Sequence, residues 1–115
     1  MLAPGIARKV PIHLNEDTAA DRDFLVREIF SFLFAQGVAG ATLMRPQAGF
    51  GSHHRMHASD GDAATRTHLP VQIEFVEAVE KVEALMPALC ELVTDGLIEA
   101  HDTMVIKAAS HQDPV

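Results

Sequence analysis

Two kinds of hydrophobic spacing follow one another along this chain, and their order constrains the fold more than any other feature. An apolar residue recurs at every second position in residues 10–14 and again in residues 69–75, which predicts two half-buried strands. Residues 22–36 and 78–94 instead carry apolar residues three and four positions apart, as amphipathic helices do. Each predicted strand is therefore followed by a predicted helix.

Two less regular apolar segments, residues 39–48 and 97–107, are expected to be the remaining strands. The order is then βαββαβ, which predicts an α+β, ferredoxin-like sandwich. In this arrangement two helices cover one face of a four-stranded antiparallel sheet. Pro11 lies inside the first strand and cannot donate a ladder hydrogen bond, so its nitrogen must face a bulge or an unpaired side.

The ends of the helices are also marked in the sequence. Asp21 is expected to cap the first helix, and Gly37 stands where that helix would end in a left-handed residue. Pro87 should kink the second helix without ending it, because the apolar stripe continues beyond it. Acidic residues complement the positive end of a helix dipole, and three are expected to open the second helix: Glu77, Glu80 and Glu83.

Length and composition indicate one small domain. The 115 residues leave room for a single core, expected at 9–107 between a flexible leader at 1–8 and a flexible tail at 108–115. The net charge of −7 argues against a nucleic-acid binder, which should be basic. No apolar run approaches the ~18 residues of a membrane helix. The lone Cys90 allows no intrachain disulfide, so a cytoplasmic location is the simplest interpretation.

The face of the sheet that the helices leave uncovered is expected to be partly polar. Such a face is unsuited to a core, yet it also includes Val76 and Val105, so we expect the sheets of several subunits to meet there. Its polar members are expected to be Lys9, His13, Gln72, Glu74, Glu99 and His101.

Several short motifs resemble the PII superfamily of trimeric signalling proteins and, more narrowly, the PII-like family called domain of unknown function 190. The resemblance covers roughly residues 9–107. Its motifs are Gly37-Val-Ala-Gly-Ala-Thr42, Gly49-Phe-Gly51, Ser52-His-His-Arg-Met-His57, Leu69-Pro-Val-Gln-Ile-Glu-Phe-Val76 and Glu80-Lys-Val-Glu-Ala-Leu-Met-Pro87.

The resemblance implies a homotrimer that binds adenine nucleotides in clefts between subunits, with residues 49–68 as the mobile arm known as the T-loop. Thr42 and the segment Gly49, Phe50 and Gly51 match positions that contact the nucleotide in PII proteins. The chain lacks the glycine-rich phosphate loop that follows the second helix in PII proteins. The positive charge for a phosphate must therefore come from other residues, with Arg55 favoured, and the candidates are Arg45, Arg55, Arg66 and Lys107.

We therefore expect a cytoplasmic regulatory protein, not an enzyme, because no nucleophile–base pair and no P-loop is present. Its target would be an unknown protein, such as a membrane transporter or an enzyme. Two alternatives remain open. One is a metal-binding trimer of the CutA type, in which His53 and His57 would be ligands, although no cysteine or carboxylate at tight spacing completes a zinc set. The other is an interaction module with no small ligand.

Overall fold

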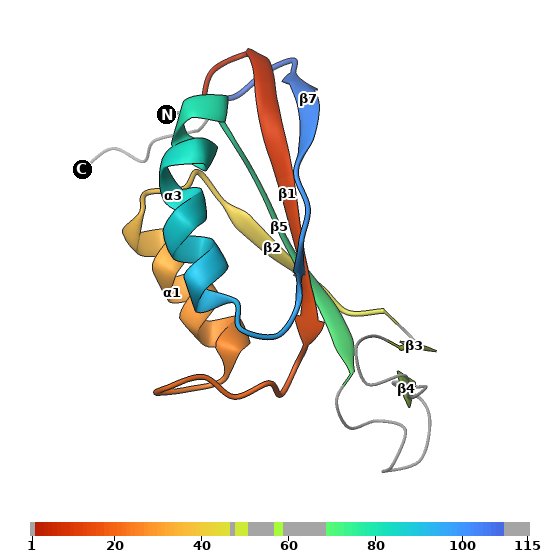
Figure 1. Ribbon diagram of the computed structural model, residues 1–115. Helices are drawn as coiled ribbons and strands as arrows, with labels where there is room; N and C mark the ends of the chain where they lie inside the picture. The colour runs from red at the N-terminus through yellow and green to blue at the C-terminus, as the bar shows by residue number, and fades with distance from the viewer. Residues whose placement is uncertain (1, 47, 51–56, 59–68, 110–115) are drawn as a thin grey trace, which may run out of the picture.

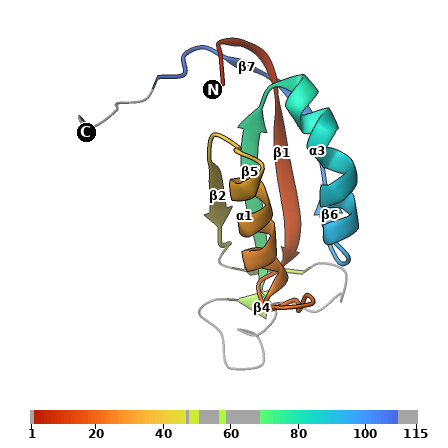
Figure 2. The ribbon, with the colours of Figure 1, turned by 90° about the vertical axis from the view of Figure 1, so that its left-hand side faces the viewer.

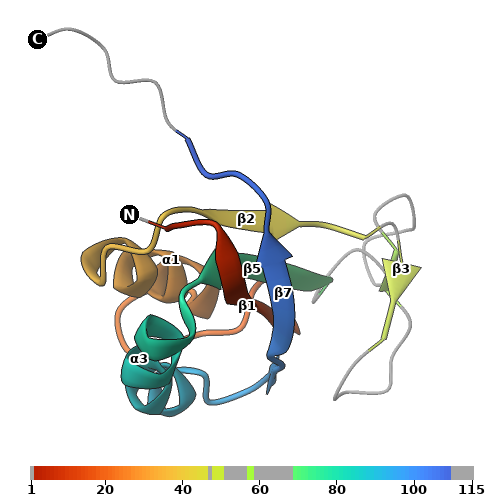
Figure 3. The same cartoon turned by 90° about the horizontal axis from the view of Figure 1, so that it is seen from above.

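The computed structural model describes residues 2–46, 48–50, 57–58 and 69–109, and these form one helix-on-sheet sandwich (Figure 1). Helices α1 and α3 lie on the same side of the main sheet (Figures 2 and 3). This confirms the predicted α+β, ferredoxin-like class. The elements in chain order are β1 (Gly5–Asn15), α1 (Leu25–Ala35), β2 (Ala41–Met44), β3 (Ala48–Gly49), β4 (His57–Ala58), β5 (Pro70–Glu77), α3 (Val79–Leu92), β6 (Leu97–Ile98) and β7 (His101–Val105).

The main sheet is antiparallel throughout, in the order β2-β5-β1-β6, with β7 also paired to β1. The register joins Ile12 to Ile98 and Lys9 to His101, so β6 and β7 continue one another along the same edge of β1. They act as a single fourth strand with a break in it. Strands β3 and β4 form a separate two-stranded ladder beyond the end of β2 (Figure 1).

Pro11 lies opposite this break. The backbone N–H of Glu99 donates to the carbonyl oxygen of Pro11 over 3.0 Å. In an antiparallel pair the two residues would normally exchange a second hydrogen bond, but Pro11 has no N–H to give. The prediction that its nitrogen faces an unpaired side is confirmed, and the ladder is interrupted where the donor is missing.

The core lies between the sheet and the two helices. Its residues from α1 and α3 are those of the predicted helical stripes, and its residues from β1 and β5 are the inward members of the predicted alternation. The buried set is Val10, Ile12, Leu14, Leu25, Ile29, Leu33, Val71, Ile73, Phe75, Val82, Leu85 and Leu89.

Helix α1 begins later than expected, at Leu25, and Phe24 stands at the capping position in place of Asp21. Local turn contacts hold the preceding segment out of the helix: the N–H of Leu25 donates to the carbonyl of Thr18 over 2.7 Å, and the carboxylate of Asp23 accepts the N–H of Phe24 over 2.7 Å. The expected end is confirmed, because Gly37 has φ 71°.

Helix α3 continues past Pro87 and ends at Leu92, whereas Glu77 is the last residue of β5 and is not part of the helix. The turn after the helix requires Gly96, which has φ 157°. A Cβ atom there would lie 2.5 Å from the carbonyl oxygen of His13. In the part of the chain that the structure describes, no helix is both long enough and apolar enough to cross a membrane.

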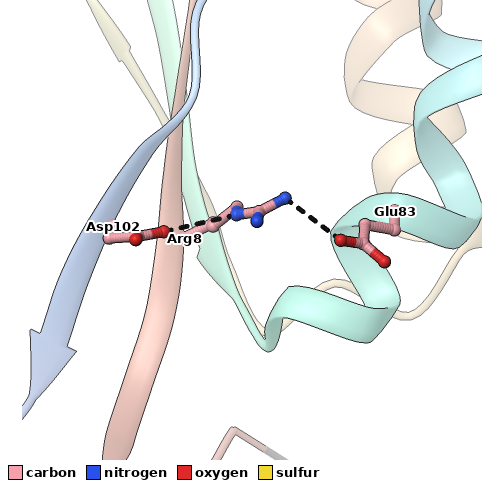
Figure 4. A network of polar contacts seen from close by, with 3 residues as sticks. All are labelled: Arg8, Glu83 and Asp102. Carbon is pink, nitrogen blue, oxygen red and sulfur yellow. Dashed lines mark hydrogen bonds and ion pairs between the residues drawn. The ribbon is translucent and has the colours of Figure 1, made fainter.

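Residues 5–8, which were expected to belong to a flexible leader, are part of β1, because this strand begins at Gly5 and its first residues pair with β7. Arg8 lies in this part of the strand. Its guanidinium is 3.4 Å from the carboxylate of Asp102 on β7 and 3.4 Å from that of Glu83 on α3 (Figure 4). These contacts join the edge of the sheet to the helix, and they could not be found in the sequence because no apolar period marks them.

Candidate functional site

Strand β2 carries the first of the predicted site residues, Thr42. Ala41 and Leu43 pack against the core, so the strand alternation places Thr42 on the open face of the sheet, where it is exposed. In the register it lies opposite Glu74 of β5. The hydroxyl group of Thr42 is thus accessible from the side of the sheet that the helices leave uncovered.

This open face is polar, as predicted, and some of its polar side chains form hydrogen bonds or close contacts with one another. His13 Nε2 lies 2.7 Å from Glu99 Oε2, and Gln72 Nε2 donates to Glu74 Oε1 over 3.4 Å. A ligand or a second subunit approaching this face would meet hydrogen-bonding groups as well as the apolar Val76.

Arg45 follows the end of β2, and its side chain contacts Glu16 in the segment between β1 and α1. Its Nη2 atom lies 2.6 Å from Glu16 Oε1, and its Nε atom donates to the same oxygen over 2.7 Å. The N–H of Glu16 also donates to the carbonyl of Leu69 over 2.8 Å, immediately before β5. Glu16 therefore contacts the residues on either side of segment 46–68, through its side chain at one end and its backbone at the other.

The remaining predicted ligand residues lie beyond Arg45. Gly49 belongs to β3 and pairs with His57 of β4, and a Cβ atom at Gly49 would lie 3.2 Å from Pro70 Cγ. Glycine at this position therefore lets β3 pass close to the start of β5. Phe50 is 62% exposed. The predictions for Gly51, His53, Arg55 and Arg66, and for the side chain of His57, fall outside the described residues.

An open groove of about 570 Å³ lies beside β2, between the end of α1 and the start of the strand. Its lining includes Phe30, Phe34, Val38 and Ala41. Phe34 is 88% exposed, so much of this lining is apolar and in contact with solvent.

Sequence analysis missed the residue that fixes the turn between α1 and β2. The carboxylate of Glu77 is buried and accepts the N–H of Ala39 over 2.8 Å. Lys81, one helical turn further on, lies 3.9 Å from Glu77 Oε2 and donates to the carbonyl of Gly37 over 2.6 Å. The available signal was the alternation of β5, which places Glu77 inward after Val71, Ile73 and Phe75.

Among the residues that the structure describes, no three histidine, cysteine or acidic side chains gather in a way that could hold a metal ion. The histidines proposed as weak metal ligands, His53 and His57, have no described side chains. The metal alternative therefore stays a prediction, with no support from the rest of the fold.

Comparison with known proteins matches nearly the whole domain to one family. The model of DUF190, described as "Uncharacterized ACR, COG1993", matches residues 7–105. The chain is 28% identical over 107 residues to UPF0166 protein MJ1524 of Methanocaldococcus jannaschii. The match covers 92% of this chain and 97% of that protein.

Solved structures with the same fold include two PII-like proteins. One is CPII of Thiomonas intermedia, a nitrogen regulatory PII-like protein bound to ADP, AMP and bicarbonate. It has a TM-score of 0.63 and 20% identity, over 90% of this chain and 97% of that chain. The other is a PII-like signalling protein of Thermus thermophilus, with a TM-score of 0.60 and 13% identity, over 91% and 94% of the two chains.

Proposed function

The chain belongs to the DUF190 family and has a PII-like fold, and from these facts we propose that it is a regulatory protein whose effector is an adenine nucleotide. The observation that carries the proposal is the likeness of almost the whole domain to CPII, a protein bound to ADP and AMP. The family model covers residues 7–105, so the segments around Thr42 and Gly49 both lie within the matched region.

The proposed assembly is a homotrimer with the nucleotide in clefts between subunits. Large apolar side chains on the surface of the single chain support an assembly, because Phe34, Met44 and Leu97 are exposed on three different elements. Thr42 would contact the ligand from the open face of the sheet. The backbone at Gly49, Phe50 and Gly51 would contact it from the other side, and Arg45 and Arg55 would meet its phosphates.

Binding would be reported through residues 49–68. A ligand can shift such a segment only by its difference in affinity for two arrangements of it. The segment would then engage or release a target protein in the cytoplasm, either a membrane transporter or an enzyme. In this function the protein transmits a signal and catalyses no reaction.

A thermal-shift assay tests the proposal. The chain has no Trp or Tyr, so unfolding is followed with an added dye in the presence of ATP, ADP, AMP or cyclic AMP, each with and without Mg²⁺. A ligand at a hundred times its Kd should add about 2.7 kcal/mol to the free energy of unfolding. We expect at least one nucleotide to do so.

A matched pair of variants ties the effect to the site. Thr42→Val keeps the shape of the side chain and removes the hydroxyl group, and it should reduce the nucleotide shift. Ser31→Ala also removes a hydroxyl group, at an exposed position of α1 that is not among the predicted ligand residues, and should leave the shift unaltered. A flat response to every nucleotide would contradict the proposal, and a response to Zn²⁺ alone would favour the metal-binding alternative at His53 and His57.

A further inference from the structure

The pair formed by Glu16 and Arg45 joins two strands that are not neighbours in the sheet. Arg45 follows β2 and Glu16 follows β1, and β5 lies between those strands. The register sets Met44 opposite Gln72 and Asn15 opposite Pro70, so the ion pair spans the first residues of β5. Two strand spacings amount to roughly 10 Å, a distance that the two long side chains together can cover.

Within the described part of the chain, this pair engages the guanidinium through one carboxylate oxygen. Both contacting nitrogen atoms of Arg45, Nε and Nη2, share the single oxygen Oε1 of Glu16. Arginine binds most strongly when two of its N–H groups meet two separate oxygen atoms of one anion. A phosphate group has several oxygen atoms and a higher charge, so it can meet Nε and Nη2 with two separate oxygen atoms.

Because both side chains are exposed, replacing the Glu16 carboxylate by another anion should cost little free energy. The side chains of Arg45 and Glu16 are 59% and 37% exposed. An ion pair in such surroundings contributes little to stability, so a competing anion needs only a modest advantage to replace the carboxylate. Glu16 would keep its place in the fold after such an exchange, because its backbone N–H remains bonded to the carbonyl of Leu69.

We propose that Glu16 is an internal competitor for the anionic ligand, holding Arg45 until a phosphate group replaces the carboxylate. This inference rests on the proposed function, and it adds a residue that selects among ligands. A neutral nucleoside gains nothing from Arg45 because it cannot displace Glu16. A nucleotide does displace it, so Glu16 makes the site select ligands that carry a negatively charged phosphate group over neutral ones.

The test measures the dissociation constants of ADP and of adenosine by titration calorimetry for the wild type and for Glu16→Gln. We expect ADP to bind about two- to fivefold more tightly to Glu16→Gln, the range set by the modest strength of an exposed ion pair. The affinity for adenosine should not change. Glu91→Gln removes the same charge from an exposed position on α3 and should leave ADP binding as in the wild type.

Arg45→Gln completes the design. It should weaken ADP binding, and adding Glu16→Gln to it should have no further effect, because the competitor would then have nothing to hold. Equal affinities in Glu16→Gln and Glu91→Gln would overturn the inference while leaving the proposed function intact. So would a gain from Glu16→Gln that persists without Arg45. Failure of ADP and of the other nucleotides to bind any of these proteins would contradict the proposed function together with the inference.

Discussion

At the scale of single residues, Glu77 connects segments that lie 38 positions apart in the sequence. Its side chain occupies an inward position of β5 and would cost free energy there if its carboxylate had no partners. It finds them in the N–H of Ala39 and the ammonium group of Lys81, which in turn holds the carbonyl of Gly37. One buried carboxylate thus positions the turn that leads into β2 and Thr42.

Replacing this carboxylate should destabilise the protein. Glu77→Ala leaves the N–H of Ala39 without its acceptor, and hydrogen bonds to charged groups are worth about 1.5–3 kcal/mol. We therefore expect the free energy of unfolding to fall by about 2 kcal/mol. It is measured by denaturant titration followed by circular dichroism. Glu91→Ala, at an exposed position near the end of α3, should change it by less than about 0.5 kcal/mol. A loss no larger than that of the control would show that Glu77 does not fix the turn.

At the scale of elements, Pro11 explains why the fourth strand is divided into β6 and β7. The pairing partners of β1 follow one register through both pieces, and the break between them falls opposite Pro11, which has no N–H to donate. Pro11→Val should restore that donor, whose N–H would face the carbonyl of Glu99. The new hydrogen bond and the lost rigidity of proline are each worth about 1 kcal/mol or less, so the overall stability should change little.

Hydrogen exchange followed by NMR measures the local effect. The amide of residue 11 should exchange slowly in Pro11→Val, as slowly as the amide of Ile12, which lies on the same strand and serves as the internal reference. Fast exchange at residue 11 with unchanged protection at Ile12 would mean that some other feature breaks the strand.

The elements that could be predicted from the sequence are those whose periodicity is imposed by burial. The stripes through Ile29 and Leu85 and the alternation through Ile73 all face the core, so their spacing records the fold directly. The start of α1 could not be predicted, because hydrogen bonds to Thr18 and Asp23 set it and no apolar pattern marks them.

The candidate site divides in the same way. Thr42 could be placed on the open face from the alternation of Ala41 and Leu43 around it. The contact between Arg45 and Glu16 could not be found, because the residues are 29 positions apart and meet only through the order of the strands.

At the scale of the whole molecule, the open face of the sheet is where we expect the subunits to meet. Val76 lies on that face, on β5 and opposite Lys9 of β1. If three sheets meet there, a charge at this position would lose its water on assembly and would stand beside the existing positive charge of Lys9. Val76→Lys should therefore separate the subunits.

Light scattering after size-exclusion chromatography gives the mass directly. We expect the wild type at three times the chain's 12.5 kDa, and Val76→Lys at the mass of a single chain or as a mixture that dissociates on dilution. Glu91→Lys, at an exposed position of α3, also adds a lysine but should keep the wild-type mass. A trimer that survives Val76→Lys would place the subunit contacts elsewhere, and the exposed Phe34 on α1 would then be the first position to test. A wild type that elutes as a single chain would leave Thr42 and Arg45 without the neighbouring subunit that the proposed nucleotide cleft requires.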